Sequence, residues 1–429
     1  MIFFLDSIEN VGDYIYIIKQ FPLEHIYKMK KNILIITAVF PPEPLTSATL
    51  NYDLAVALSE KYNVTVLTPR PSRPVGFDFS NIKANENKKF KHIILHSYVH
   101  PASSFLGRMK ESKSFGKAAA KYIEQHHNEI DFVYNDGWQL FSLYIDAKAC
   151  VKYGIPYIVP VQDIYPESVL TKIPNICGSH AIVKMLLSGK DKYYLKHAAK
   201  IRTITDSMAN YLSSTRKVAI ENFLAVANWQ NDEEFDDYKT TFRKNGKTVF
   251  MFVGNNNKQA NVELMIRAYH AAKLDNAEFR IMGGGNAKDD CMALAKELGH
   301  DDIIFDGVPK GMVASVQKEA DAMVLALIGG TGTQGVPSKL TAYMFSGKPV
   351  IASMDAEADA AKMIIEAKSG YVTKADDIEA FAESFRKIAN HSDNDLEVMG
   401  ENSRKFAENK LSRKANLSLV CNEIDKILR

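Results

Sequence analysis

From Lys31 onward, short apolar runs rich in β-branched and aromatic residues alternate with longer stretches of helical pattern. This alternation predicts parallel sheets whose strands are joined by crossover helices. The first set of expected strands comprises Asn32–Ala38, Asn63–Thr68, His92–His96, Phe132–Asn135, Pro156–Val161 and Lys200–Thr205. The second set comprises Thr248–Val253, Glu278–Met282, Ile303–Phe305, Ala322–Leu327 and Pro349–Ser353. Because 429 residues exceed the size of one ordinary domain, the two sets predict two doubly wound α/β domains.

A polar, weakly patterned stretch near residues 228 to 246 separates the two sets. We therefore expect a first domain over residues 29–228 and a second domain over residues 229–400. Residues 1–28 precede the first expected strand and are predicted to be an N-terminal extension. Residues 401–429 hold a helical pattern from Glu401 to Leu428, which we expect to pack back across the domain junction. Ligands bind at the carboxyl ends of strands in such sheets, so a cleft between the domains is expected.

The overall composition is that of an ordinary globular protein, with 46% hydrophobic and 24% charged residues and a net charge of +2. This balance gives no general bias toward nucleic acid. No uninterrupted apolar run reaches the roughly 18 residues of a membrane span, and the N-terminal residues lack the features of a signal peptide. The four cysteines are far apart and lack metal-ligand spacing. We expect a cytoplasmic protein with reduced thiols at Cys150, Cys177, Cys291 and Cys421.

Two glycine-rich loops follow expected strands of the second domain. Gly254 and three asparagines, Asn255 to Asn257, come directly after one strand and precede Lys258. Glycine and asparagine tolerate the left-handed backbone of an anion-binding nest, and a lysine adds a point charge for a diphosphate. The next strand leads into Gly283 and Gly285, where the backbone either approaches a ligand closely or makes a simple tight turn.

A third glycine-rich loop, from Gly329, leads into an expected helix that starts at Pro337. The backbone N–H groups of Ser338 and Lys339 would then lie at a positively polarised helix end, which favours an anion. Lys339 opposes the helix dipole, so either it serves an anionic ligand or it is an ordinary solvated lysine.

The first domain offers two further candidate surfaces. The Pro-rich loop after Thr37 runs into a helix whose N-terminus either faces a phosphate or sugar or is a stiffened, capped connection. Farther along, Lys110, Lys113, Lys117 and Lys121 fall on one helical stripe, with apolar neighbours Phe105, Leu106, Met109, Phe115 and Tyr122. This stripe either lies on an anionic membrane or forms a solvated helix face.

Together, the segments GNNNKQAN, IMGGG, FDGVPK and PSKLTAYMFSGKPVIAS occur in the order seen in family 4 retaining glycosyltransferases. In the first domain, PYIVPVQDIYPES, KIRTITDSMANYL and the later Asn228–Trp229 pair resemble the bacterial surface-polysaccharide (O-antigen and capsule) branch of that family. The resemblance runs from about Met29 to the C-terminus. It implies a GT-B fold of two Rossmann-like domains and transfer of a sugar from a nucleotide-sugar donor, most simply UDP-linked, to a lipid-linked or glycan acceptor.

The resemblance also implies roles for individual residues. Lys339, Gln334, Lys258 and Asp163 would be catalytic. The nucleotide-sugar would be held by Gly254, Asn255, Lys258, Gly283, Gly285, Val308, Pro309, Gly335, Pro337, Ser338 and Lys339, with Val308 and Pro309 near the base. Asp163 and Glu167 would face the cleft, as would Asn135 and Asp136, although Asp136 also suits a helix cap. The family commonly carries two glutamates where this sequence has Gln334 and Ala342, and alanine cannot hold a ribose.

We expect no catalytic metal and no other cofactor, because lysines and a helix end meet the phosphate charge and the leaving diphosphate can help to deprotonate the acceptor. The acidic segment Asp393–Asn394–Asp395 is predicted to cap a helix. No nucleic-acid partner is expected, and the protein would act in the cytoplasm, on the inner face of the membrane. Two other functions remain open: a UDP-sugar epimerase of the same fold, and a non-catalytic partner protein.

Overall fold

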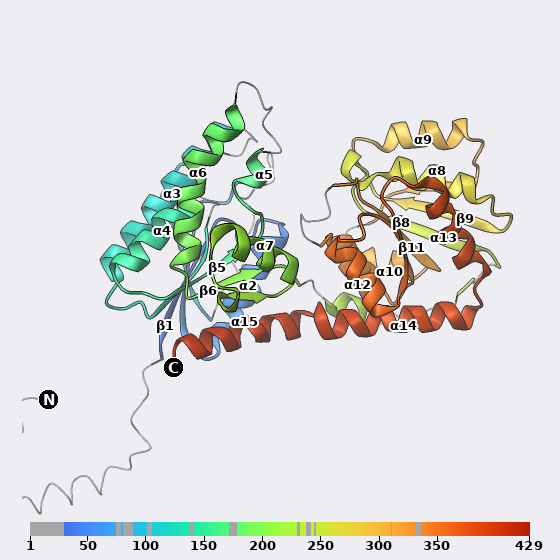
Figure 1. Ribbon diagram of the computed structural model, residues 1–429. Coiled ribbons are helices and arrows are strands. Elements are labelled where there is room, and N and C mark those ends of the chain that lie inside the picture. Colours follow the sequence, from blue (N-terminus) through green and yellow to red (C-terminus); the bar gives the residue numbers. More distant parts are fainter. Residues whose placement is uncertain are drawn as a thin grey trace, which may run out of the picture.

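A computed structural model describes residues 30–73, 79, 89–100, 105–137, 141–170, 178–229, 232–236, 242–243, 246–309, 311–330 and 336–429. These residues form two α/β domains, each built on one parallel sheet (Figure 1). The expected extension over residues 1–28, Cys177, Gln334 and Gly335 lie outside the described residues.

The first domain contains a sheet of seven parallel strands in the order β3-β2-β1-β4-β5-β6-β7. Its strands are β1 (Asn32–Thr37), β2 (Asn63–Thr68), β3 (Lys91–Ile94), β4 (Phe132–Asp136), β5 (Tyr157–Val161), β6 (Lys200–Thr203) and β7 (Phe223–Ala225). Its helices are α2 (Thr46–Ser59), α3 (Phe105–His126), α4 (Phe141–Lys152), α5 (Glu167–Leu170), α6 (Ser179–Lys196) and α7 (Asp206–Arg216), with a short 3-10 turn at Ile220–Asn222.

The second domain contains six parallel strands in the order β10-β9-β8-β11-β12-β13. Its strands are β8 (Thr248–Val253), β9 (Ala277–Met282), β10 (Ile303–Asp306), β11 (Ala322–Ala326), β12 (Val350–Ser353) and β13 (Gly370–Thr373). Its helices are α8 (Val262–Ala272), α9 (Lys288–Glu297), α10 (Val313–Gln317), α11 (Ser338–Phe345), α12 (Asp359–Ala367), α13 (Ile378–Asn390) and α14 (Asp393–Lys410), with 3-10 turns at Asp232–Phe235 and Lys258–Ala260.

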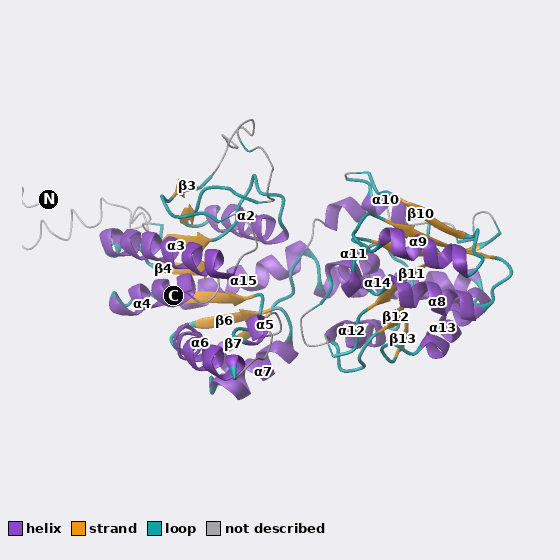
Figure 2. Ribbon diagram, turned by 90° about the horizontal axis from the view of Figure 1, so that it is seen from above, coloured by secondary structure: helices purple, strands orange, loops and turns teal. Residues whose placement is uncertain are grey.

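Helices cover both faces of each sheet, as the view from above shows (Figure 2). In the second domain every residue of β8 is buried, because alternate side chains enter two separate cores. Phe250 and Phe252 pack with α8, α9 and α13, whereas Met251 and Val253 pack with α11, α12 and α14. The strand order and the parallel pairing confirm the predicted fold class of two doubly wound Rossmann-like domains.

Two strands were not predicted from the sequence, β7 and β13. Both are short edge strands, and all of their residues are only partly buried. Their β conformation is stabilised by pairing with β6 and β12 rather than by a local apolar run, which explains why the sequence pattern does not reveal them.

The chain crosses between the domains twice. Trp229, the first residue of the expected second domain, is 2% exposed and packs in the core of the first domain with Ile33 and Val420, whereas Phe235 packs in the core of the second. The C-terminal segment then returns: α14 packs on the second domain, and α15 (Arg413–Ile427) packs on the first beside α2. Figure 1 shows these two helices running along one side of both domains.

The helical pattern over Glu401–Leu428 is divided between α14 and α15. The helix breaks at Leu411, and Ser412 accepts a hydrogen bond from the N–H of Ala415 as the N-cap of α15. The apolar periodicity of the sequence continues through this break because Leu411 itself is buried in the core of the second domain. The acidic segment at Asp393 does cap a helix, since Ser392 and Asp395 form a capping box at the start of α14.

The carboxyl edges of the two sheets approach each other at one point. Ser207, near the start of α7, donates a hydrogen bond to Asp359, the first residue of α12, and Lys362 Nζ contacts the same serine oxygen at 3.1 Å. Both helices follow directly on strands of their own sheet, β6 and β12. The strand ends that bind ligands in doubly wound sheets are therefore brought together.

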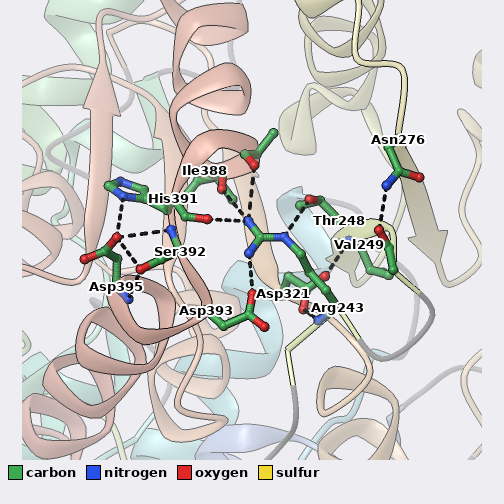
Figure 3. A network of polar contacts seen from close by, with 12 residues as sticks. Arg243, Thr248, Val249, Asn276, Asp321, Ile388, His391, Ser392, Asp393 and Asp395 are labelled. Carbon is green, nitrogen blue, oxygen red and sulfur yellow. Dashed lines mark hydrogen bonds and ion pairs between the residues drawn. The ribbon is translucent and has the colours of Figure 1, made fainter.

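Arg243 lies near the end of the segment that joins the first domain to β8 (Figure 3). It holds that segment at the edge of the second sheet opposite the carboxyl edge. Its guanidinium donates hydrogen bonds to the carbonyls of Ile388, Ala389 and His391 at the C-terminal end of α13, at 3.3, 3.2 and 2.7 Å. It also pairs with Asp393 at the start of α14. Arg243 thus satisfies carbonyls that the helix end leaves without intrahelical partners.

We expect Arg243→Ala to lower the free energy of unfolding of the second domain by about 2–3 kcal/mol, because several carbonyls would lose a charged donor. Calorimetric unfolding of the purified protein measures this change. The matched control is Arg267→Ala, which removes an exposed pair with Glu263 and should cost less than about 0.5 kcal/mol. Equal effects of the two substitutions would contradict the conclusion that the hydrogen bonds of Arg243 to the end of α13 stabilise the second domain.

None of the helices that the structure describes combines the length and apolar character needed to cross a bilayer. Cys150 and Cys291 are buried free thiols, and Cys421 is a partly buried one.

Candidate functional site

The strands of the second sheet separate at its topological switch point, between β8 and β11. Residue pairing between the two stops at Met323 and Met251, so within the part of the chain that the structure describes, Val253 at the end of β8 has no backbone partner on that side. The hydroxyl of Tyr343 on α11 fills the gap: it accepts a hydrogen bond from the Val253 N–H at 2.9 Å and donates to its carbonyl at 3.0 Å. Tyr343 thereby fixes α11 against the carboxyl end of β8, where a ligand crevice is expected.

Lys339 lies in the first turn of α11, directly over the end of β8. Its ammonium sits 4.8 Å from the ring centre of Phe252, and its side chain passes across Gly254. Burial lowers the pKa of this lysine, and no carboxylate among the described residues pairs with it. A partly buried cation for which the described residues supply no counter-charge, in the first turn of a helix whose N-cap is a proline, is suited to an anionic ligand.

The reason for a glycine at position 254 is visible in this contact. Gly254 has a φ of +151°, and a Cβ built on it would lie 2.2 Å from Cε of Lys339. Two residues that were singled out separately in the sequence are therefore in direct contact.

Gly283 and Gly285 make room for a neighbouring backbone rather than for a ligand. A Cβ on Gly283 would lie 2.3 Å from the carbonyl oxygen of Gly254, and one on Gly285 would lie 1.9 Å from that of Asn256. The two loops are hydrogen-bonded backbone to backbone, from the N–H of Gly254 to Met282 and from that of Asn256 to Gly284. Glycine is required because two backbones approach each other, a reason that the sequence analysis did not consider.

Lys258 and Asn255 differ in position from Lys339. Both are exposed, and Lys258 lines a polar groove of about 750 Å³ between the starts of α8 and α9, with Arg267, Asp290 and Asp376. No contact between Lys258 and Lys339 is found within the described ranges. Asn256, by contrast, is fully buried and lies 3.7 Å from the thiol of Cys291.

The remaining candidates of this domain lie at the same carboxyl edge. Val308 and Pro309 follow β10, the former packed partly on the core and the latter exposed. Pro337 is the extended N-cap of α11 rather than its first helical residue, so the helix begins at Ser338. Ala342 is 7% exposed and offers no polar atom beyond its backbone. Gln334 and Gly335 belong to the undescribed residues 331–335.

In the first domain, the two carboxylates that were expected to face the cleft lie in different environments. Asp163 is exposed in the loop after β5. Glu167 is held by Arg216 at 2.6 Å and by the hydroxyl of Tyr211 at 2.9 Å. These contacts lower the pKa of Glu167 against the opposing effect of burial, and they make it part of a structural ion pair.

The switch point of the first sheet, between β1 and β4, carries a polar cluster. Thr37 and Asp136 are paired residues at the ends of these strands. The side-chain amide of Asn51 on α2 donates to Thr37 Oγ1 at 2.8 Å and to Asp136 Oδ2 at 2.6 Å. Asp136 does not cap α4, as one sequence interpretation had it, because it is the last residue of β4 and α4 begins only at Phe141.

Asp136 is only partly exposed, and burial raises its pKa to about 7 against the opposing effects of the Asn51 hydrogen bond and the charge of Arg202. Neighbouring Asn135 is fully buried and does not reach the crevice. Only the strand order shows that β4, which ends in Asp136, flanks the switch point, because an acid at a strand end does not by itself reveal which strands become neighbours.

The lysine stripe of α3 is exposed along its whole length, at Lys110, Lys113, Lys117 and Lys121. Phe115, which was expected to form apolar surface beside it, is instead buried in the core of the first domain. Lys148 and Lys152 of α4 extend the basic surface, and together with Tyr144, Tyr153 and three of the stripe lysines they line a groove of about 950 Å³. Exposed apolar side chains on these helices include Val151 of α4, which lines the groove, Leu106 of α3, and Ile182, Met185 and Leu186 of α6.

Two Rossmann-like domains whose strand ends meet define the GT-B architecture, and solved structures of that fold align over nearly the whole chain. HepE of Anabaena, solved with UDP and glucose, has a TM-score of 0.63 at 13% identity over 92% of this chain and 100% of that one. WaaB, a lipopolysaccharide outer core galactosyltransferase, has a TM-score of 0.62 at 17% identity over 92% and 99%. At these identities the likeness shows the fold.

Sequence comparison adds a family match to the second domain. Residues 234–406 match the model described as Glycosyl transferases group 1. WbjE, a probable glycosyltransferase of Pseudomonas aeruginosa, is 23% identical over 243 residues, which are 55% of this chain and 60% of that protein. The similarity thus spans less than two thirds of that relative's length. The matched region of this chain contains Gly254 and Lys339.

Proposed function

We propose that this protein is a retaining glycosyltransferase that moves a hexosyl or N-acetylhexosaminyl group from a UDP-sugar to a lipid-linked or glycan acceptor during synthesis of a bacterial cell-surface polysaccharide. The observation that carries the proposal is Lys339, a partly buried cation without a described counter-charge at the start of α11. It lies within the segment that matches the glycosyl transferases group 1 model.

In this reaction the bond between the donor sugar and the diphosphate breaks while a hydroxyl oxygen of the acceptor bonds to the same carbon. The hydroxyl proton passes to the leaving diphosphate, and the anomeric configuration is retained. Negative charge grows on the leaving diphosphate. Lys339 and the N-terminus of α11 stabilise that charge where water is partly excluded, and Lys258 adds a more solvated contact. The uracil ring of the nucleotide lies near Val308 and Pro309. Gln334 and Asp163 bind hydroxyls of the sugar.

A metal ion is not needed in this scheme, because lysines and backbone N–H groups meet the phosphate charge. The replacement of the usual glutamates by Gln334 and Ala342 weakens the hold on the ribose but leaves the diphosphate contacts intact. The family resemblance of the PSKL segment supports retained activity, since the polysaccharide branch often lacks the second glutamate.

The test uses the full chain, labelled UDP-glucose, UDP-galactose and UDP-N-acetylglucosamine in turn, and a bacterial lipid extract, all in excess EDTA. We expect UDP release and label in the lipid phase. Conversion of the sugar in water without lipid would indicate an epimerase instead. Loss of transfer in EDTA with recovery in magnesium or manganese would refute the metal-free site. No UDP binding by calorimetry and no UDP release would indicate a non-catalytic partner.

We further propose that the basic face of α3 and α4 holds the protein on the anionic inner surface of the membrane, where a lipid-linked acceptor is presented. The support is the exposed lysine stripe, its continuation in Lys148 and Lys152, and the exposed aliphatic side chains of α6. Lysines near such a surface bind through charge, and aliphatic side chains add apolar contact.

Replacing Lys110, Lys113, Lys117 and Lys121 by Gln should weaken binding to phosphatidylglycerol vesicles at least 100-fold, since each lysine contributes about 1 kcal/mol near an anionic surface. Vesicle sedimentation measures this loss, and UDP affinity should not change. The control variant replaces four exposed lysines of the second domain, Lys273, Lys296, Lys405 and Lys410, by Gln. If both variants bind vesicles equally well, the membrane assignment is wrong.

A further inference from the structure

The Thr37–Asn51–Asp136 cluster occupies the place in the first domain that Lys339 occupies in the second. Each lies at the carboxyl end of the two strands that flank a topological switch point, β1 and β4 in one sheet and β8 and β11 in the other. Ligands of doubly wound sheets bind at this position. One switch point carries a cation and the other carries a carboxylate.

The cluster holds Asp136 in a defined orientation. Asn51 is 2% exposed, and its amide is fixed by the hydroxyl of Thr37 and by the carbonyl of Ser47 at 2.9 Å. The two N–H donors of this amide are shared among these two oxygens and Oδ2 of Asp136, which lies 2.6 Å from Asn51 Nδ2. No hydrogen bond to the other carboxylate oxygen, Oδ1, is found within the described ranges, and the side chain is partly exposed. One oxygen is used to orient the carboxylate, and the other is available to a ligand.

We propose that Asp136 is an acceptor-binding residue, whose Oδ1 accepts a hydrogen bond from a hydroxyl of the sugar that receives the transferred group. This inference rests on the proposed transferase function. A carboxylate oxygen can only accept hydrogen bonds when ionised, so the ligand must be a donor, and sugar hydroxyls are donors. A phosphate would be repelled here and attracted to Lys339, which assigns the donor diphosphate and the acceptor sugar to opposite domains.

The ionisation of Asp136 makes this assignment measurable. With burial raising the pKa to about 7, the carboxylate is mostly protonated at pH 6 and mostly ionised at pH 8. The groups that oppose this shift are the Asn51 amide on α2 and the Arg202 guanidinium on β6. Acceptor binding should therefore strengthen as the pH rises through about 7, whereas binding of UDP, which does not touch Asp136, should lack this dependence.

The central variant is Asp136→Asn. Because Asn51 presents a donor, the new side chain must turn its carbonyl oxygen to Asn51, and its NH₂ group then faces the crevice where an acceptor atom stood. We expect kcat/KM for the lipid-extract acceptor to fall at least tenfold, with the loss mainly in KM. UDP affinity by calorimetry and the slow hydrolysis of the UDP-sugar by water should be unchanged, and the rise of kcat/KM between pH 6 and pH 8 should disappear.

A second variant separates binding from a structural role. Asn51→Ala removes a hydrogen bond that lowers the pKa of Asp136, so the midpoint of the pH profile should move upward from about 7 instead of vanishing. If the Asn51–Asp136 hydrogen bond only supported the fold, Asn51→Ala would not move the midpoint of the pH profile of acceptor kcat/KM.

An Asp136→Asn variant with wild-type acceptor kcat/KM and an unaltered pH profile would overturn the inference while leaving the transferase function standing. Equal losses in UDP affinity and acceptor use would overturn it as well, because Asp136 would then support the fold. A wild-type protein that binds no UDP or transfers no sugar would instead refute the proposed function, and this inference with it.

Discussion

Replacing Lys339 by Ala should lower UDP affinity roughly 10- to 100-fold, because one charge-assisted contact to a phosphate contributes about 1.5–3 kcal/mol. Transfer should fall at least as much, since charge on the diphosphate grows as the sugar leaves. The effect is large because this ammonium is partly buried and no described carboxylate neutralises it. Isothermal titration with UDP measures the loss.

Two other lysine variants serve as comparisons for Lys339→Ala. Lys258→Ala removes an exposed lysine of the same edge and should weaken UDP binding by no more than about fivefold, because an exposed ion pair contributes roughly 0–1 kcal/mol. Lys273→Ala, at the far end of α8, should have no effect. If Lys258→Ala proves more damaging than Lys339→Ala, the diphosphate lies in the α8–α9 groove and our placement of it is wrong.

Replacing Gly254 by Ala should reproduce most of the Lys339→Ala defect although no charge is removed. The new methyl group would lie 2.2 Å from Cε of Lys339 at a φ of +151°, so the lysine must leave its place over Phe252. The strained backbone should also lower the free energy of unfolding by about 1–3 kcal/mol. UDP titration and calorimetric unfolding follow the two effects separately.

The double variant of Gly254→Ala and Lys339→Ala tests whether Gly254→Ala weakens UDP binding by displacing Lys339. If the glycine acts on UDP through the lysine, the second substitution should add little to the first, and a double-mutant cycle should give a coupling close to the whole effect of one of them. Additive losses would mean that Gly254 contacts the ligand directly. Gly284→Ala is the control, because a Cβ there meets no atom within 4 Å and should leave UDP affinity unchanged.

Much of the fold was predictable from local pattern. The strands β2 and β8 were located to the residue: β8 is an almost unbroken apolar run, and β2 alternates β-branched and apolar residues between polar turns. Ser392 and Asp395 form the kind of cap that their spacing predicts. Phe115 shows where local pattern fails: the helical spacing that brings the α3 lysines to one face does not tell which neighbouring side chains turn to the core.

The sequence by itself determined the succession of strands and helices, the two-domain organisation, the loop that begins at Gly254 and the helix start that carries Lys339. These properties depend on residues a few positions apart, whose period and turn chemistry are readable along the chain. The tertiary structure alone decided that Lys339 lies across Gly254, 85 residues earlier in the chain (339 − 254). It also decided that Asn51 reaches Asp136 across a separation of 85 residues. Such contacts follow from strand order, and strand order is set by the packing of whole sheets and helices, which no short stretch of sequence specifies.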